Sequence, residues 1–388
     1  MRILNIITRL DKGGSAENTI YCAISLKDQY DSFLISGLTN DPTGTTKNIL
    51  SKHRINYYCI PELVRSIHPC KDLVAFFKLY CFIKKHRFRL VHTHTSKAGI
   101  LGRWAAWLAG VRIIVHTPHG HVFSGYYGRW VSLFFLWLER ITARITATLI
   151  ALTPAEERAY HDYRVKPMGS IAVIHSGITM GRFLEAKPDT AMIRKSLGFD
   201  TAVHIVGTVT RLEPVKGTID LINAWQLVLQ QFPDARLMIV GDGSLRNELV
   251  SRTHILGICS SVIFTGLRYD LPEILSVMRF LVLPSLNEGM GKVIVQAALM
   301  GKPTIGTKVC GIPDMIQHNQ TGLLVPPKDH YALSRAIIRL LEDDSFTQKL
   351  AARAKQWVLE PVDGFARFSK ELMVHRLNTL YRAHLTSH

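Results

Sequence analysis

An α/β protein made of two parallel, doubly wound sheets is predicted by the pattern of strands and helices and by the chain length. In the second half, short runs rich in Val, Ile and Leu, such as "HIVGTV", "RLMIVGDG" and "FLVLPS", alternate with helical stretches. Strands that are apolar throughout and separated by helices are typical of parallel sheets with both faces covered. The first half repeats the pattern with "RILNIIT", "DSFLISG", "RLVHTH" and "RIIVHTPHG". A chain of 388 residues exceeds one ordinary core, so two domains are expected.

The domain boundary is expected in "VIHSGITMGRF", residues 173–183, where glycines interrupt the end of an apolar strand. The sequence thus predicts one Rossmann-like domain over residues 1–175 and a second over residues 176–365. Residues 366–388 have a helical pattern, and we expect them to cross back onto the first domain. Ligands of open parallel sheets bind beyond the carboxyl ends of the strands, so the two domains are expected to face a cleft.

Composition narrows the compartment and the class of partner. The six cysteines lie far apart with no C-x-x-C pair, which fits neither a disulfide framework nor a zinc site. The apolar part of "MRILNIITRL" is too short for a signal peptide, and no window offers the roughly 18 uninterrupted apolar residues of a membrane span. We therefore expect a cytoplasmic protein. Most of the net charge of +17 lies in the first half, where an anionic partner would be held.

Two cations follow one predicted strand of the second domain. The segment "GTVTRLEPVKG" places Arg211 directly after the strand and Lys216 five residues later. A guanidinium fork and an ammonium point charge at a strand's carboxyl end suit a diphosphate. The alternative is a solvated pair of loop charges, which this segment alone leaves open.

The stretch "EGMGKVIVQ" places one carboxylate, Glu288, between a strand and a helix that begins near Gly291. Free N–H groups at such a helix start, with Gly289 and Gly291 allowing close approach, form an anion site. Glu288 beside it would suit hydroxyls of a sugar carried by the phosphate, although a helix cap is the alternative role. Gln296 lies about two helical turns further on, so both side chains can face one ligand.

These motifs carry a resemblance that covers nearly the whole chain. The sequence resembles the retaining glycosyltransferases of the GT-B fold, most closely family 4, of the type that builds bacterial surface polysaccharides. The most specific stretch is "EGMGKVIVQAALMGKPTIGTKVCGIPDMI". Four further segments resemble the Gly-rich first loop, the pocket histidine, the interdomain linker and the phosphate pair: "LDKGGSAENT", "HTPHGHVF", "VIHSGITMGRF" and "RLEPVKG". "TGLRYDLPEIL" resembles the segment whose backbone reads the base.

The resemblance implies a role for each candidate site residue. Glu288 and His119 are expected to contact the donor sugar as the catalytic residues. Gly13 and Gly14 would let the first loop close over the diphosphate, although a plain strand-to-helix turn explains them equally. The other donor-binding residues implied are Arg211, Lys216, Arg268, Gly289, Met290, Gly291 and Gln296.

The roles assigned to His119 and Gln296 depend on the resemblance in different ways. A lone loop histidine is more often structural, so only the motif gives His119 a ligand role. A structural role is expected for the other histidines near these strands: His92, His94, His116, His121 and His175. The family usually has glutamate at both ends of "EGMGKVIVQ", where this chain ends in Gln296. The second acid is expected to bind the ribose, a hydrogen bond that an amide can also make.

The implied reaction transfers a sugar, with retention of configuration, from a nucleotide-diphosphate donor to a lipid-linked glycan on a polyprenyl diphosphate. A UDP-sugar is the expected donor. No metal or other cofactor is expected, because the chain contains no Asp-x-Asp motif and because Arg211, Lys216 and a helix terminus can stabilise the leaving diphosphate.

A predicted helix over residues 129–145 bears on the acceptor. At about 100° per residue, one apolar face would carry Trp130, Phe134, Phe135, Leu138, Ile141 and Ile145. The opposite face would mix three arginines with apolar groups: Arg129, Arg140, Arg144, Leu133, Leu136 and Trp137. Such a mixed face suits the surface of an anionic membrane, which would make the protein peripheral on the inner face of the cell membrane. Burial against a neighbouring helix is the alternative.

Two other functions compete with this one. A nucleotide-sugar epimerase of similar architecture would need no lipid acceptor. A nucleic-acid-binding protein would explain the charge of +17, but the sequence shows no helix-turn-helix, zinc finger or RNP-like motif, and its basic residues are scattered. We therefore expect no nucleic-acid partner.

Overall fold

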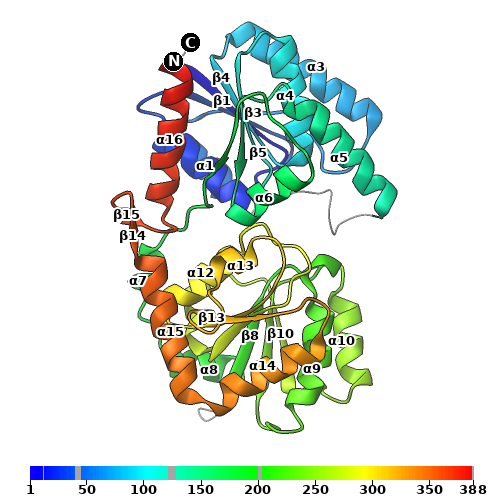
Figure 1. The fold of residues 1–388 in the computed structure, drawn as a ribbon, viewed down its shortest axis with the longest axis vertical. Helices are drawn as coiled ribbons and strands as arrows, with labels where there is room; N and C mark the ends of the chain where they lie inside the picture. Colours follow the sequence, from blue (N-terminus) through cyan, green and yellow to red (C-terminus); the bar gives the residue numbers. More distant parts are fainter. Residues whose placement is uncertain (12, 40–44, 121–127, 200–202, 387–388) are drawn as a thin grey trace. The chain divides into compact units, whose positions relative to one another are not determined.

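The computed structural model describes residues 1–11, 13–39, 45–120, 128–199 and 203–386 (Figure 1). It forms two compact units. Unit 1 consists of Met1–Gly177 and Lys370–His388, and unit 2 consists of Ile178–Ser369.

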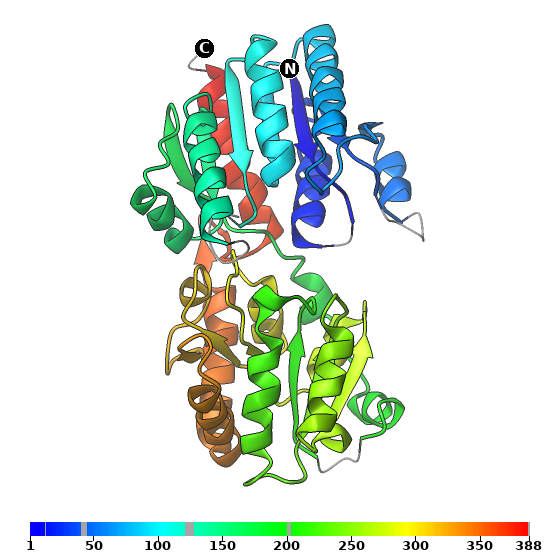
Figure 2. The same ribbon diagram turned by 90° about the vertical axis from the view of Figure 1, so that its right-hand side faces the viewer.

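Unit 1 is built on a seven-stranded parallel sheet with the order β3-β2-β1-β4-β5-β6-β7. Its strands are β1 (Arg2–Ile7), β2 (Asp31–Ser36), β3 (Asn56–Cys59), β4 (Leu90–His94), β5 (Ile113–Thr117), β6 (Thr148–Ala151) and β7 (Ser170–Val173). Its helices are α1 (Gly14–Ser25), α2 (Thr45–Lys52), α3 (Pro69–His86), α4 (Ser96–Leu108), α5 (Arg129–Ala143), α6 (Pro154–Asp162) and α16 (Lys370–Thr386). Helices cover both faces of this sheet (Figures 1 and 2).

The period of two in β1 explains how the two faces are filled. Leu4 and Ile6 pack with α3 and α4, whereas Ile3 packs with α1 and α16. Asn5 therefore lies on the α1 and α16 face, where it is 2% exposed. A polar residue in a central strand needs a buried partner, which for Asn5 is His94 of β4.

The C-terminal helix α16 belongs to unit 1 and lies beside α1 (Figure 1). Its Tyr381 hydroxyl is 2.5 Å from Nδ1 of His92 on β4. Asn378 accepts a hydrogen bond from the Tyr30 hydroxyl at 3.0 Å. The C-terminal half of α16 thus closes the core that α1 covers only in part.

Unit 2 repeats the arrangement with a six-stranded parallel sheet in the order β10-β9-β8-β11-β12-β13. Its strands are β8 (Ile205–Val209), β9 (Arg236–Val240), β10 (Val262–Gly266), β11 (Phe280–Leu283), β12 (Thr304–Thr307) and β13 (Gly322–Val325). Its longer helices are α9 (Thr218–Val228), α10 (Arg246–Ile255), α12 (Lys292–Leu299), α14 (His330–Glu342) and α15 (Asp344–Leu359). The short elements are α7 (Gly181–Leu184), α8 (Thr190–Ser196), η1 (Pro214–Lys216), η2 (Cys259–Ser261), α11 (Leu271–Val277), α13 (Ile312–Met315) and the β14 (Pro361–Val362) and β15 (Phe365–Ala366) hairpin. The predicted pair of doubly wound parallel sheets is confirmed.

Helix α5 differs from the prediction in which side chains it buries. Leu136, expected on the mixed outer face, is 6% exposed, whereas Trp130, expected on the inner face, is 81% exposed. A polar contact sets the orientation: Arg103 of α4, fully buried, forms a bidentate ion pair with Glu139 at 2.7 and 2.8 Å. Apolar periodicity cannot reveal a face that is buried around an ion pair. Within the described part of the chain, no helix is both long and apolar enough to span a membrane.

We predict that Glu139→Ala lowers the free energy of unfolding by roughly 3 to 5 kcal/mol, because it leaves the buried Arg103 charge without its carboxylate. Chemical denaturation of variant and parent measures this loss. Lys78→Ala is the matched control, since its pair with Glu62 is partly exposed to water and should contribute at most about 1 kcal/mol. Equal losses in the two variants would contradict a buried, interdependent pair.

Candidate functional site

In unit 2, the loops that follow β8 and β11 bring Lys216 and Glu288 into direct contact. The two strands are neighbours in the sheet, so their carboxyl ends meet at one edge. Nζ of Lys216 pairs with Oε2 of Glu288, and the Ser285 hydroxyl lies 3.5 Å from the same oxygen. Lys216 is only 8% exposed, so this ion pair is largely shielded from water. Two residues that the sequence assigned to one ligand are therefore adjacent.

Backbone contacts hold together the loops that follow β8 and β11. The N–H of Leu286 donates to the carbonyl of Val215 at 2.8 Å, and the N–H of Gly311 donates to the carbonyl of Glu288 at 3.1 Å. Gly217 follows Lys216 with φ of 62°, and a Cβ there would lie 2.1 Å from the Pro284 carbonyl oxygen. Only glycine permits this approach, which explains the last residue of "RLEPVKG".

Helix α12 begins at Lys292, four residues after Glu288, and its N-cap residue makes no side-chain capping hydrogen bond. Its N-cap is Gly291, which has φ of 70°. The first-turn N–H groups of such a helix favour an anion. Met290 is buried and Gln296 is half-buried within the helix. Gly289, Met290 and Gly291 lie between Glu288 and α12, and their donor-binding role stays a prediction.

The two arginines of the prediction are placed differently. Arg211 is exposed after β8 and joins no ion pair within the described ranges. Arg268 forms a bidentate contact with Asp270, with its Nε 2.9 Å from Oδ1. This contact lowers the pKa of the Asp270 carboxyl below its usual value. A nucleotide base that bound the Arg268 guanidinium would have to compete with the Asp270 carboxylate.

In unit 1, Gly13 and Gly14 form the start of α1. Gly13 is the N-cap in an extended conformation, with φ of 164°. A Cβ there would meet its nearest described neighbour, the Asp11 carbonyl oxygen, only at 3.9 Å. Packing within the described chain therefore does not require glycine at this position, and its role toward a diphosphate stays a prediction.

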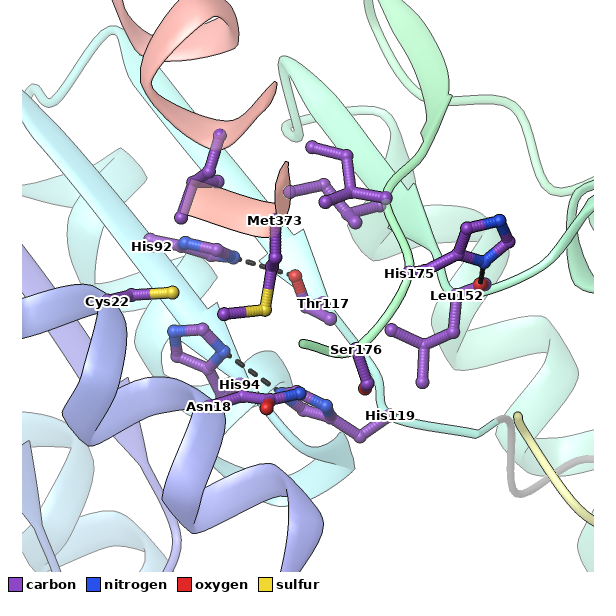
Figure 3. Close-up of a pocket in the computed structure, with 13 residues that line it drawn as sticks. Asn18, Cys22, His92, His94, Thr117, His119, Leu152, His175, Ser176 and Met373 are labelled. Atoms are coloured by element: carbon purple, nitrogen blue, oxygen red, sulfur yellow. Dashed lines mark hydrogen bonds between the residues drawn. The ribbon is translucent and has the colours of Figure 1, made fainter. Parts of the chain in front are cut away.

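His119 follows β5 and lines a cavity of about 30 Å³, which is room for about one water molecule (Figure 3). Its Nε2 lies 3.1 Å from Nδ1 of His94, the last residue of β4. Nε2 of His94 lies 3.3 Å from the side-chain oxygen of Asn5 on β1. His119 adopts a left-handed backbone with φ of 58°, which is unfavourable for a residue with a side chain.

Three neighbouring histidines, His92, His94 and His116, are buried, and burial favours their uncharged form. Burial is the main cause that lowers the pKa of His92 to about 3 and the pKa values of His94 and His116 well below their usual value. His92 lies between the hydroxyls of Tyr381 and Thr117, and His116 bonds to Thr93. His175 lies 2.6 Å from the Leu152 carbonyl oxygen. His121 lies outside the described residues.

Glu156 of α6 is a buried carboxyl that the sequence analysis overlooked. It is 2% exposed, and burial raises its pKa to about 7, opposed by the N–H groups of Leu152 and Gly120. The Leu152 N–H donates to Oε2 at 2.6 Å, whereas Oε1 has no hydrogen-bond partner in the part of the chain that is described. The carboxyl therefore lies next to the backbone of the His119–Gly120 turn.

We predict that Glu156→Gln stabilises the protein more at pH 8 than at pH 5. The pKa of the folded carboxyl, about 7, exceeds the ordinary 4.5, so the folded chain retains a proton that the unfolded chain has lost. Stability of the parent thus falls as pH rises from about 4.5 to about 7 and stays lower above it. The amide of the variant does not titrate, so it removes this loss. At about 1.4 kcal/mol per unit of pKa difference, the variant should gain up to roughly 3 kcal/mol in free energy of unfolding at pH 8.

Denaturation of the parent and variant at both pH values measures the effect. The matched control is Glu157→Gln, a partly exposed neighbour on the same helix, which should show no such difference. A gain that is equal at pH 5 and pH 8 would show that Glu156 titrates normally.

His94 contacts the candidate residue His119, and Asn5 contacts His94; sequence reasoning gave His94 a structural role and did not single out Asn5. The signal was present in "VHTH", because residues two apart in a strand face the same side, but the Asn5 contact depends on which strands pair. Within the described residues, no group of three or more His, Cys, Asp or Glu side chains is arranged to hold a metal ion.

Comparison with known proteins identifies the family. Residues 189–357 match the family model for glycosyl transferases group 1, and residues 47–177 match the glycosyl transferase 4-like domain. The chain is a group 1 glycosyltransferase. It is 33% identical over 293 residues to the UDP-Gal:alpha-D-GlcNAc-diphosphoundecaprenol alpha-1,3-galactosyltransferase of Escherichia coli, covering 74% of this chain and 76% of that protein.

Other similarities extend over more of the glycosyltransferase. The N-acetyl-alpha-D-glucosaminyl L-malate synthase of Bacillus anthracis is 28% identical over 90% of this chain and 88% of its own length. The crystal structure of Anabaena HepE in complex with UDP and glucose has a TM-score of 0.82 at 22% identity, covering 99% of this chain and 100% of that chain. This structural likeness confirms the GT-B fold.

Proposed function

We propose that this enzyme is a retaining glycosyltransferase that moves a sugar from a UDP-sugar to a polyprenyl-diphosphate-linked glycan in bacterial surface polysaccharide synthesis. The observation that carries the proposal is the shielded Lys216–Glu288 pair beside the uncapped start of α12. An ammonium and the N–H groups at a helix start suit a diphosphate, and a carboxylate next to them suits sugar hydroxyls. The Escherichia coli relative, whose name gives UDP-Gal and a diphosphoundecaprenol-linked GlcNAc, supports the choice of donor and acceptor.

Each residue then has a distinct chemical task. Lys216 and Arg211 bind the diphosphate and stabilise its charge as it leaves. Glu288 binds hydroxyls of the transferred sugar, and Gln296 binds the ribose with its neutral amide. His119 makes a hydrogen bond to the sugar near the reacting carbon. The remaining donor contacts are assigned to Gly13, Gly14, Arg268, Gly289, Met290 and Gly291.

We predict that Glu288→Gln and Gln296→Ala affect different steps. Glu288→Gln should lower turnover strongly without weakening UDP, because UDP lacks the sugar and because the change frees Lys216 from its carboxylate. Gln296→Ala should weaken UDP by roughly 0.5 to 1.5 kcal/mol, the value of a neutral hydrogen bond. Calorimetry with UDP and UDP release from the donor measure the two effects.

Lys216→Ala provides the positive control for nucleotide binding. Loss of a charge-assisted contact should weaken UDP by roughly 1.5 to 3 kcal/mol. If Glu288→Gln keeps full turnover while Gln296→Ala keeps UDP affinity, the assignment of "EGMGKVIVQ" fails, and Glu288 is a structural partner of Lys216.

We propose that the reaction needs no metal ion, since Lys216, Arg211 and the start of α12 supply the positive potential that the leaving diphosphate requires. Turnover should persist in excess EDTA. An abolished reaction that Mn²⁺ or Mg²⁺ restores would refute this part of the proposal while leaving the sugar and nucleotide contacts to be judged by their own variants.

The acceptor side of the proposal draws on an exposed apolar surface of unit 1, here named the aromatic patch. It comprises exposed side chains that share one face of α5: Trp130, Val131, Leu133, Phe134 and Trp137. Arg129, Arg140 and Arg144 are exposed on or next to the same helix α5. Aromatic groups combined with arginines suit the boundary of an anionic membrane, where a polyprenyl acceptor resides. We therefore place the enzyme on the cytoplasmic face of the cell membrane.

We predict that Trp130→Glu together with Leu133→Glu releases the enzyme from anionic liposomes while leaving it folded. Both side chains are exposed, so the substitutions remove membrane contacts without opening a core. Ile255→Glu with Met192→Glu is the matched control, because it makes the same change of charge at exposed apolar positions of unit 2. Sedimentation that falls equally in both double variants would indicate a nonspecific charge effect, and unchanged sedimentation would refute the patch.

A further inference from the structure

Three side chains from three different elements form one hydrogen-bonded series in unit 1. Asn5 of β1, His94 of β4 and His119 after β5 are linked by contacts of 3.3 and 3.1 Å. In Figure 3 the His94 and His119 rings lie next to each other, joined by a dashed line. The rings are stacked at 27°, with centroids 5.4 Å apart.

The placement of the Asn5 side-chain oxygen next to His94 sets the direction of the series. The side-chain oxygen of Asn5 can only accept a hydrogen bond, so Nε2 of His94 must carry a proton. A neutral His94 then has a lone pair on Nδ1, which accepts from Nε2–H of His119. We propose that Asn5 and His94 are positioning residues that hold His119 in the Nε2–H tautomer, which puts the acceptor lone pair of the ring on Nδ1.

The surroundings of His94 keep it neutral, as this direction requires. His94 is 3% exposed, and burial, followed by the nearby His92, His119 and His116, lowers its pKa well below the usual value. The other described residues that line the cavity include Asn18 and Cys22 from α1 and Met373 from α16, and the lining contains no carboxylate. No described neighbour in the cavity would therefore favour a charged imidazolium.

The backbone gives a reason for a dedicated positioning residue. His119 and Gly120 both have positive φ, 58° and 104°, in the turn after β5 ends at Thr117, so sheet pairing does not hold the His119 backbone. The contact to His94, which is itself held by a strand, supplies the missing constraint. Asn5 and His94 belong to neighbouring strands paired in parallel, so both are anchored by the sheet.

The inference rests on the proposed function in one respect, the contact of His119 with the sugar, and the experiment separates the two. Nitrogen NMR of the ¹⁵N-histidine-labelled enzyme reports the tautomer without any substrate, with His119→Ala used for assignment. We expect a protonated Nε2 and an unprotonated Nδ1 in His119. A protonated Nδ1, or a rapidly exchanging mixture in the parent, would overturn the inference.

His94→Leu and His94→Asn test the mechanism of positioning. Leucine removes the acceptor, and we expect a mixture of His119 tautomers and at least roughly tenfold lower turnover with unchanged UDP affinity. Asparagine places an oxygen near the former Nδ1 and should restore much of both signals. Asn5→Leu should act in the same direction as His94→Leu.

The double variant decides whether His94 acts through His119. His94→Leu should have no further effect on turnover once His119 is alanine, because the side chain to be positioned is gone. An equal loss in both backgrounds would show an independent role for His94 and refute the inference. Full turnover of His119→Ala would instead refute the proposed sugar contact, while the NMR result would still decide the tautomer.

Discussion

The carboxyl ends of parallel strands decide which side chains of this enzyme can meet. In unit 2, β8 and β11 are neighbours, so the loops that carry Lys216 and Glu288 leave the sheet side by side. In unit 1, the neighbouring order β1, β4 and β5 brings Asn5, His94 and His119 together. The same constraint, applied to two unrelated sets of residues, yields an ion pair in one unit and a neutral hydrogen-bonded series in the other.

Burial makes these contacts sensitive to the loss of a partner. Lys216 and Arg103 are both cations shielded from water, and each has one carboxylate that compensates its charge. They differ in what can replace that carboxylate. Arg103 lies fully inside unit 1 and can only be structural, whereas Lys216 follows a strand end where an anionic ligand can take over from Glu288. Position in the sheet thus distinguishes a structural ion pair from one suited to exchange.

Much of the fold could be predicted from the sequence, because strands such as "FLVLPS" are apolar throughout and therefore buried on both faces. The contact of Lys216 with Glu288 was also within reach, since both residues follow strands. The buried face of α5 could not be predicted, because the orientation of this helix depends on the Arg103–Glu139 pair rather than on apolar periodicity. The partner of Asn5 was hidden for another reason: strand order brings β4 next to β1, and a single sequence does not show it. Asp270, two residues after Arg268, was visible as "RYD" and overlooked.

The position of α16 in unit 1 decides how the two units can be expressed separately. Both chain ends lie in unit 1, so the unit 2 segment, Ile178–Ser369, is an insertion into unit 1. A truncation after Gly177 would discard Tyr381 and Leu377, leaving His92 and the core beneath α1 uncovered. Joining Gly177 to Lys370 through a short link would preserve them, because these two residues lie close together. A Cβ on Gly177 would be 2.5 Å from the Lys370 Cα. Unit 2 is thus a continuous domain inserted into unit 1, whose own sequence is divided in two.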